Sequence, residues 1–326
     1  MSVKSKTAVA IIFILAITVL SAASGQAADF SIEGGNTVVD QAGRRIRVEK
    51  PFARIISLYG AHTENLFALG CREQIIGVSP HEDYPAEAAQ KPVFSYHDDP
   101  EKVLAGRPDL VLVRPMIDRG YPAFVQRLAK SGIAVVSLQP GTVEEMLVYW
   151  EVLGLLTGRE AQAAAMAQRF TAATADLRSL TTGIQPKKRV YFEAIHGKMK
   201  TFAPDSMAVF ALEAAGGLNV AGDAQPVRDT NIAAYGKERI LARASEIDVF
   251  LAQYGTMNQP TIELIKSESG FKAIQAMKTG QVYIIDERLV SRPTLRLLDG
   301  IFEIGKILYP DDFTQKAREI INRARQ

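Results

Sequence analysis

The amino-acid sequence predicts an α/β protein of two similar lobes with parallel sheets covered by helices, a long helix between the lobes and a ligand cleft where they meet. Short apolar segments alternate with helical segments along most of the chain. The pattern of residues 101–113 recurs at 238–251, and residues 54–56 are echoed at 189–191. The separation along the sequence between the two copies is far longer than the roughly 20–50 residues of a solenoid repeat. We therefore interpret it as the repetition of a whole lobe.

The elements of the first half follow in order. Residues 30–48 alternate between apolar and polar and turn at Asp40-Gln41-Ala42-Gly43, which predicts a β-hairpin. Short runs of β-branched residues and leucine are typical of parallel strands that are buried on both faces. Such runs predict strands at 55–58, 75–78, 110–113 and 133–138, with helices at 63–69, 100–105 and 121–130 between them.

A long helical stretch separates the halves. Residues 142–182 contain no proline, are rich in alanine and leucine, and repeat apolar residues at helical spacing, with Gly158 as an expected interruption. Residues 159–180 alone would form a helix of about 33 Å at ~1.5 Å per residue. We interpret this helix as a rigid connector, since flexible linkers are rich in glycine and serine. The predicted division is an N-terminal lobe at 29–157, a connecting helix at 158–184 and a C-terminal lobe at 185–326.

The strand-and-helix alternation resumes in the second half. A strand is predicted at 189–194, and a helix at 206–215 is ended by Gly216-Gly217. Further elements of the same alternation are predicted at 238–244, 249–252, 261–266, 271–277 and 282–285, followed by a helix at 296–308 and another that begins at Pro310.

Residues 1–28 are predicted to be a secretory signal peptide. Lys4 and Lys6 precede an apolar run at 8–20 and small residues at 21–28, the three parts of such a signal. The run is shorter than the roughly 20 residues of a membrane span, which is why we favour cleavage near Ala27 or Ala28 over a retained anchor. The export signal has no cysteine for lipid attachment. We therefore expect a periplasmic protein.

Composition and motifs exclude several classes of protein. Without residues 1–28, basic and acidic residues balance, whereas nucleic-acid-binding domains are normally basic. Cys71 is the only cysteine, so no intramolecular disulfide can form, and we expect it to be a buried structural thiol. The chain has no dinucleotide-binding, phosphate-loop, nucleophile-elbow or HExxH motif. The sequence therefore predicts a protein that is not an enzyme and carries no cofactor.

The candidate ligand-binding residues follow the ends of predicted strands, where open α/β sheets bind ligands. All four histidines lie at such positions, and so do several tyrosines and arginines. Neutral imidazole suits transition metals, phenolate suits ferric iron, and arginine pairs with carboxylate or phosphate. Together they predict a cleft for a metal held in an anionic organic chelator, with the metal's own ligands unassigned. The candidates are Tyr59, His62, His81, Tyr96, His97, Arg114, His196, Tyr254 and Arg292.

Several segments together resemble a known family, the periplasmic binding proteins of ABC importers for iron-siderophores, haem and cobalamin. The segments that carry the resemblance are 38–58, 76–79 with 83–85, 101–113, 216–221 and 292–310. The resemblance covers nearly all of the chain after residue 28. It implies two Rossmann-like lobes joined by one long helix, with the ligand held between them. It also implies that Glu101 and Glu238 dock onto arginines of the membrane permease, one from each lobe.

The predicted function is therefore that of the substrate-binding component of an ABC importer. It would capture an iron-siderophore or a similar metal chelate as a monomer and deliver it to a permease in the inner membrane, with no nucleic-acid partner. Three alternatives within binding proteins stay open: haem bound through Tyr96, cobalamin, or a transition metal coordinated directly by the histidines. An alternative from another class is a periplasmic enzyme or chelatase-like protein with a histidine site.

Overall fold

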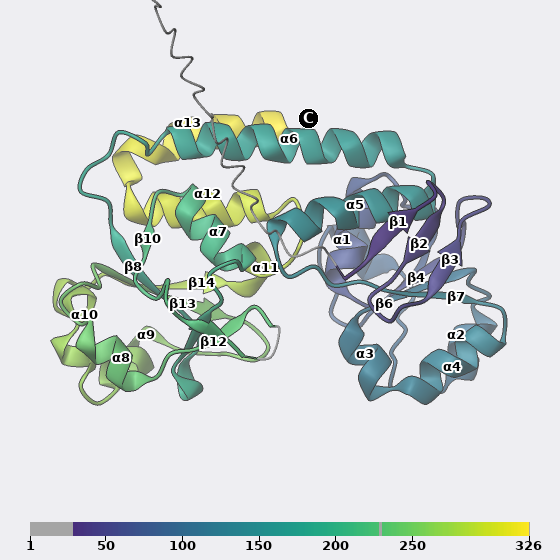
Figure 1. The fold of residues 1–326 in the computed structure, drawn as a ribbon, viewed down its shortest axis with the longest axis horizontal. Helices are drawn as coiled ribbons and strands as arrows, with labels where there is room; N and C mark the ends of the chain where they lie inside the picture. Colours follow the sequence, from purple (N-terminus) through teal and green to yellow (C-terminus); the bar gives the residue numbers. More distant parts are fainter. Residues whose placement is uncertain (1–28, 228–229, 326) are drawn as a thin grey trace, which may run out of the picture.

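A computed structural model describes residues 29–227 and 230–325. The predicted signal peptide, residues 1–28, lies outside the described residues. Two lobes lie beneath a layer of long helices that runs across both of them (Figure 1). In the part of the chain that the structure describes, no helix combines the length and the apolar character that crossing a membrane requires.

The N-terminal lobe contains a four-stranded parallel sheet in the order β5-β4-β6-β7. Its strands are short and apolar, and their predicted positions are confirmed to within a residue. The structure adds a helix, α3, that we did not predict, directly after β6. The elements are β4 (Ile55–Ser57), α1 (Gly60–Ala68), β5 (Ile75–Val78), the 3-10 helix η1 (Ala86–Gln90), α2 (Pro100–Ala105), β6 (Leu110–Val113), α3 (Pro115–Gly120), α4 (Pro122–Lys130) and β7 (Ala134–Ser137).

A small antiparallel sheet precedes this lobe. It has three strands, one more than the predicted hairpin: β1 (Ser31–Glu33), β2 (Thr37–Val39) and β3 (Arg45–Arg47). The buried carboxylate of Asp40 holds the turn between β2 and β3, because it accepts hydrogen bonds from the backbone N–H groups of Ala42 and Arg44. It also accepts one from the N–H of Ser137 at 2.9 Å. The turn is thereby fixed to β7.

The C-terminal lobe contains a seven-stranded mixed sheet, which differs from the wholly parallel sheet that we predicted. Its central strands β10, β8, β13 and β14 are parallel, whereas β9, β12 and β11 are antiparallel. The physical reason is the short turn η2 (His196–Lys198), since a connection this short can only join antiparallel neighbours. The strands are β8 (Arg189–Ile195), β9 (Lys200–Phe202), β10 (Leu218–Asn219), β11 (Gln225–Pro226), β12 (Ile232–Ala234), β13 (Val249–Tyr254) and β14 (Val282–Asp286).

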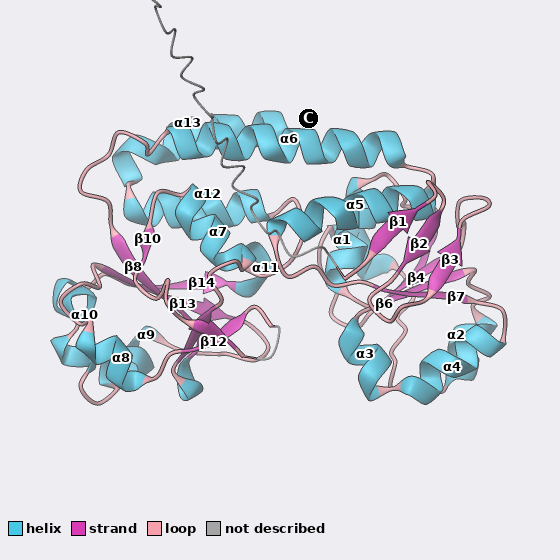
Figure 2. Cartoon of the chain, viewed as in Figure 1, coloured by secondary structure: helices cyan, strands magenta, loops and turns pink. Residues whose placement is uncertain are grey.

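Seven α-helices and two 3-10 helices, η2 and η3, are described in the second half of the chain, and the groups of strands and helices can be followed in Figure 2. The predicted helix at 271–277 is divided in two. The helices are α7 (Met207–Ala214), α8 (Lys237–Ala242), α9 (Ile262–Ser267), η3 (Phe271–Ala273), α10 (Gln275–Thr279), α11 (Glu287–Val290), α12 (Leu297–Leu308) and α13 (Pro310–Ala324).

The repeat in the sequence corresponds to a repeat in the structure. In each lobe a short helix leads into a central strand, α2 into β6 and α8 into β13. The same hydrogen bond, from an arginine backbone N–H to an aspartate carboxylate, lies at the start of both sheets. The Asp109 carboxylate accepts the backbone N–H of Arg54 at 2.8 Å, and the Asp248 carboxylate accepts the N–H of Arg189 at 2.9 Å. We conclude that the two lobes are built alike around their central strands.

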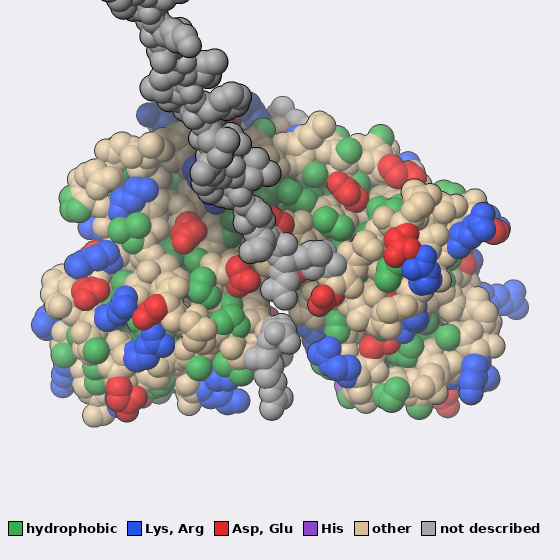
Figure 3. All heavy atoms as spheres, in the orientation of Figure 1, with side chains coloured by type: hydrophobic (Ala, Val, Ile, Leu, Met, Phe, Trp, Pro, Cys, Tyr) green, Lys and Arg blue, Asp and Glu red, His purple; other side chains and the backbone are tan. Residues whose placement is uncertain are grey.

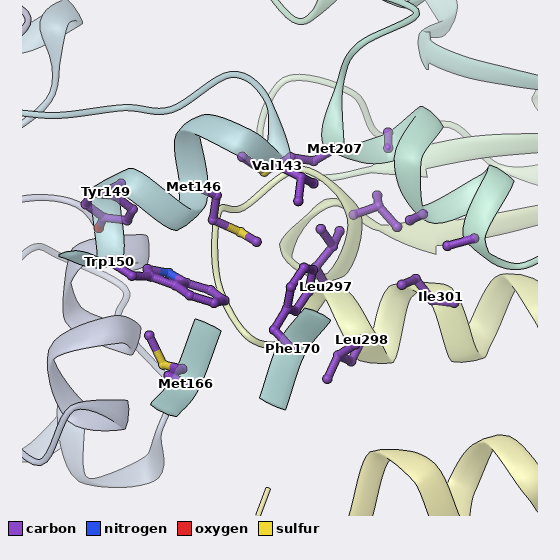
Figure 4. Close-up of a cluster of buried hydrophobic side chains, with 14 of the residues drawn as sticks. Val143, Met146, Tyr149, Trp150, Met166, Phe170, Met207, Leu297, Leu298 and Ile301 are labelled. Carbon is purple, nitrogen blue, oxygen red and sulfur yellow. The ribbon is translucent and has the colours of Figure 1, made fainter. Parts of the chain in front are cut away.

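The connector consists of two helices in tandem. α5 (Val143–Thr157) ends at Gly158, whose φ of +68° closes the helix, and α6 (Glu160–Ser179) follows at once. The 20 residues of α6 span roughly 30 Å, and the helix passes over both lobes (Figure 1). Beneath it, Trp150 meets Phe170 edge to face at 5.5 Å between ring centroids, and Leu297 of α12 lies in the same cluster (Figure 4). One core therefore continues from lobe to lobe.

Candidate functional site

A cleft of about 870 Å³ lies between the lobes. Loops that follow β4, β5, β6 and β7 form one wall, and loops that follow β13 and β14 form the other, together with the start of β12. These are the carboxyl ends of parallel strands, where open α/β sheets place their ligands. The cleft has the size of an organic ligand site. Seven of the predicted residues line it: Tyr59, His81, Tyr96, His97, Arg114, Tyr254 and Arg292.

Aromatic side chains dominate one part of the N-terminal wall. The rings of Tyr96 and His97 lie 4.3 Å apart, and both contact Tyr121, with ring centroids 4.7 and 5.0 Å away. The Arg114 guanidinium lies 5.0 Å from the ring centroid of Tyr59. This wall offers flat apolar faces with polar edges, which suits a ligand that is itself partly apolar.

The C-terminal wall presents two exposed side chains to the cleft. Tyr254 is 47% exposed and Met257 is 73% exposed. Tyr254 is the last residue of β13, and Met257 lies in the loop that follows. Asn258 holds this loop: its side-chain oxygen accepts from the backbone N–H of His196 at 3.0 Å, and its side-chain nitrogen donates to the Gln253 carbonyl at 2.7 Å. A ligand in the cleft would therefore meet a firmly supported apolar rim.

Most of the charges in the cleft are neutralised by the protein itself. Arg288, at the start of α11, donates to Asp286 and also, across the cleft, to Asp83 of the N-terminal lobe at 2.6 Å. Bonds to both carboxylates raise the pKa of the Arg288 guanidinium. Glu287 forms no ion pair with any described residue. The described lining of the cleft thus has little spare positive charge.

A partly buried carboxylate, Glu82, lines the cleft, and a buried one, Glu64, lies behind the cleft residue Arg292. Glu82 is hydrogen-bonded to Ser79, and burial raises the pKa of Glu82 to about 7. Glu64 of α1 is only 4% exposed, and its Oε1 accepts from Arg292 at 2.8 Å and from Arg296 at 3.4 Å. Burial also raises the pKa of Glu64. Arg292 therefore joins the lobes as well as lining the cleft.

His62 is not part of the cleft, contrary to our prediction. α1 begins directly after β4, so His62 lies on the inward face of this helix, where its side chain is fully buried. Its Nε2 donates to the Val113 carbonyl at 2.9 Å, and its Nδ1 accepts from the Tyr149 hydroxyl at 2.6 Å. Both bonds are made by the neutral ring. His62 joins α1, β6 and α5 and is a structural residue.

This burial predicts a loss of stability in acid. Loss of solvent lowers the pKa of His62 from 6.5 to about 4. Between these values the unfolded chain binds a proton that the folded chain does not, so stability falls as pH falls from 6.5 to 4, by roughly 3 kcal/mol in total. Urea unfolding at several pH values should show this loss in the wild type and in a control, His97→Gln. In His62→Gln the loss of stability between pH 6.5 and 4 should be smaller by roughly 3 kcal/mol. Plots of stability against pH that run parallel in His62→Gln and the wild type would contradict the burial of a neutral His62.

His196 also lies outside the cleft. It is 5% exposed and sits in the η2 turn, with its Nδ1 at 3.1 Å from both carboxylate oxygens of Glu193. The hydrogen bond that His196 donates to the Glu193 carboxylate raises the pKa of His196, and burial raises the pKa of Glu193. Because the chain turns back from β8 into β9, the residues that follow β8 belong to a hairpin and not to a strand-to-helix loop at the cleft. His196 supports the loop after β13 through its backbone.

The four histidines therefore do not form one metal site. His81 and His97 line the cleft, whereas His62 and His196 are buried in separate lobes. Across residues 29–227 and 230–325, no group of three or more histidine, cysteine, aspartate or glutamate side chains is arranged to hold a metal ion. The charged cleft residues that sequence reasoning did not select are Glu82, Asp83, Asp286, Glu287 and Arg288, and their role depends on tertiary pairing.

The two predicted docking glutamates lie in matching positions. Glu101 is in the first turn of α2 and Glu238 in the first turn of α8, and both are exposed. Both helices lie on the side of the molecule away from α6 (Figure 1). The Glu101 carboxylate accepts a hydrogen bond from Arg127 Nε at 2.9 Å. On the face drawn in Figure 3, side chains of both charges are intermingled.

Comparison with known proteins identifies the family. The family model described as "Periplasmic binding protein" matches residues 55–289, which includes both walls of the cleft. The chain belongs to this family. Proteins of the family bind a substrate for an ABC transporter rather than transform it, and they are periplasmic or anchored at the outer surface of a membrane. The two-lobed architecture that we predicted is confirmed by the solved relatives.

Three relatives illustrate the similarity. The chain is 24% identical to the uncharacterised ABC transporter substrate-binding lipoprotein YvrC of Bacillus subtilis, over 86% of this chain and 87% of the relative. It is 25% identical to the vitamin B12-binding protein of Vibrio cholerae, over 78% and 89%. A solved structure of a possible iron-binding periplasmic solute-binding protein from Staphylococcus epidermidis matches with 27% identity and a TM-score of 0.70, covering 80% of this chain and all of that one.

Proposed function

We propose that this protein is exported and captures a metal chelate of low net charge, most simply an iron-siderophore, in the cleft between its lobes. The observation that carries the proposal is the internal pairing of the cleft's charges. The lining includes the guanidiniums of Arg114, Arg288 and Arg292, and two of these three are paired with carboxylates of the protein. Among the described residues, what is left for a ligand is one free guanidinium, aromatic faces and a set of carboxylates.

Charge then discriminates between classes of chelate. A complex with several negative charges would meet the Glu287 carboxylate in a partly desolvated cleft, where like charges a few ångströms apart repel each other by several kcal/mol. Glu82, with a pKa of about 7, adds only part of a charge near neutral pH. A neutral or weakly charged complex avoids that repulsion and can use the rings of Tyr59, Tyr96 and Tyr254. This refines our expectation of an anionic chelator, since one unpaired guanidinium in the described part of the lining suits one negative group.

A corrinoid is the second candidate. The observation in its favour is the similarity to proteins named for vitamin B12 binding, at about 25% identity over most of both chains. Cobalamin is also bulky, partly apolar and low in charge. We do not pursue direct coordination of a bare transition metal by the four histidines, because two of them lie outside the cleft.

Delivery to the permease completes the proposed function. We propose that Glu101 and Glu238 each meet an arginine of the permease. Support comes from their exposure, from their equivalent places in the two lobes and from their position on one side of the molecule. The docking of both lobes at once would hold the mouth of the cleft against the membrane partner.

The ligand class is tested by calorimetry with a panel of purified compounds. The panel contains a ferric trihydroxamate, a ferric tris-catecholate, haem and cyanocobalamin. We expect the trihydroxamate or cyanocobalamin to bind one to one, at least about tenfold more tightly than the tris-catecholate, a difference of ~1.4 kcal/mol. Preference for the tris-catecholate would contradict the charge argument. Chemical conversion of any of the four compounds by the protein would favour the enzyme alternative.

A further inference from the structure

A second cavity, of about 280 Å³, lies behind the cleft at the junction of the lobes. Its walls come from α1 and Tyr84 of the N-terminal lobe, from Arg169 of α6, and from Thr294 to Arg296 and Arg325 near the end of the chain. The proposed function uses none of this space. The cavity has a mouth, because Tyr84 is 42% exposed and the Arg325 side chain is 46% exposed.

Three buried polar atoms of this lining have no partner among the described residues: Glu64 Oε2, Asn65 Oδ1 and Thr294 Oγ1. Their residues are 4%, 1% and 1% exposed. The remaining side-chain polar atoms of Glu64 and Asn65 already have partners. Glu64 Oε1 accepts from two arginines, and Asn65 Nδ2 donates to the Pro293 carbonyl at 2.8 Å. Buried polar groups in proteins are nearly always hydrogen-bonded. Three such atoms in one cavity indicate an occupant.

The charge of the lining favours an anion. The guanidiniums of Arg169, Arg296 and Arg325 line the cavity, beside the carboxylate of Glu64. Arg325 is paired with Asp299, and Arg296 shares the Glu64 carboxylate with Arg292. Arg169 is therefore the guanidinium of the described lining that has no carboxylate partner. Arg169 uses its Nε on the Ala324 carbonyl at 3.1 Å, which leaves its two terminal nitrogens. Guanidinium groups match the oxygens of phosphate and carboxylate in geometry as well as charge. The cavity, compared with about 30 Å³ for one water molecule, is large enough for a small oxyanion.

The unpartnered oxygens then select among anions. The carboxylate Oε2 of Glu64 and the amide Oδ1 of Asn65 can only accept hydrogen bonds. A fully ionised anion has nothing to donate to them, whereas an oxyanion that keeps a proton does. We propose that this cavity binds a small protonated oxyanion of the hydrogenphosphate class. Arg169, Arg296 and the Thr294 hydroxyl bind its ionised oxygens, and its O–H group donates to Glu64 Oε2.

An anion bound in this cavity would contact both lobes and, through Glu64, a residue of the cleft. Its walls include both lobes and the connecting helix α6, and Glu64 binds Arg292, which lines the cleft, through the same carboxylate. An anion in this position fixes the orientation of the Glu64 carboxylate and thereby of Arg292. It would act at the junction of the lobes rather than as the transported ligand.

Calorimetry and phosphorus NMR with inorganic phosphate, in a mildly alkaline buffer in which phosphate keeps one proton, test the proposal. We expect one saturable site that binds phosphate at least about tenfold more tightly than sulfate. Thr294→Val keeps the shape of the side chain, and Arg169→Met keeps its apolar stem. Each should weaken phosphate binding by about tenfold. Glu64→Gln places an amide donor at the selecting position and should bring the ratio of phosphate to sulfate affinity to about one.

Arg178→Met is the matched control, since Arg178 also lies on α6 but packs over Phe210 outside the cavity. It should leave phosphate binding unchanged. The proposal is overturned by the absence of saturable phosphate binding, by equal affinity for sulfate in the wild type, or by unchanged binding in a folded Thr294→Val variant. These outcomes are independent of the cargo of the main cleft, because every measurement is made without a chelate.

Discussion

Replacing both Glu101 and Glu238 by lysine is expected to abolish ligand uptake by cells and to leave the ligand affinity of the purified protein unchanged. Both carboxylates are exposed and neither lines the cleft. Reversing two charges sets lysine against arginine at two points of the docked complex, and like charges across an interface cost several kcal/mol. Uptake should fall to below about a hundredth of the wild-type rate, since each 1.4 kcal/mol is a factor of ten.

The matched control reverses two other exposed acids in the first turn of helices, Glu144 of α5 and Glu160 of α6. Glu144→Lys with Glu160→Lys makes the same change of net charge, but on the helical layer on the other side of the molecule. It should support normal uptake. Uptake at the wild-type rate in the docking double variant would refute the role of Glu101 and Glu238, whatever the ligand proves to be.

The second large effect is expected from Gly300→Ala. Gly300 lies in α12, and a Cβ atom there would be 2.3 Å from the carbonyl oxygen of Leu289 in α11. A backbone carbonyl cannot move aside as a side chain can, so α12 and α11 would have to separate. We expect unfolding free energy to fall by about 2–3 kcal/mol. α11 also positions Glu287 and Arg288 in the cleft, so ligand affinity should fall as well.

Gly120→Ala is the control for that prediction. Gly120 ends α3, and a Cβ atom there has no heavy atom within 4 Å. Alanine also loses less backbone entropy on folding than glycine does, so this variant should be as stable as the wild type or slightly more so. Chemical unfolding of both variants, with ligand titration, checks the pair. Equal stability of Gly300→Ala and the wild type would show that the two helices are not in such close contact.

Much of the fold could be predicted because the local signals are strong. Val111 and its neighbours are apolar at every position, as a strand covered on both faces must be, and Gly158 marks the junction of the tandem helices. The turn from β8 into β9 was missed, because nothing near His196 distinguishes a tight hairpin from a strand-to-helix loop. The mixed character of the second sheet follows from that one turn.

The candidate site could be predicted only in part, because position along the chain does not give the direction of a side chain. Tyr59 and His62 follow the same strand, yet the first lines the cleft and the second is buried against Tyr149. Tyr59 still has extended backbone at the N-cap of α1, whereas His62 lies within the helix, although the two ring centroids are only 5.2 Å apart. The importance of Glu82 comes from burial, and that of Arg288 from its pairing across the cleft with Asp83. Neither property is local.

The continuous connecting helix has a consequence for the transport cycle. α6 contains neither proline nor glycine, so it offers no bending point, and a filled carrier should differ little in outline from an unfilled one. A transporter that recognises the overall shape of the carrier would then bind filled and unfilled carriers alike. When cargo is scarce, unfilled carriers occupy its docking positions, and the ratio of filled to unfilled carriers, rather than the amount of filled carrier alone, sets the rate of import.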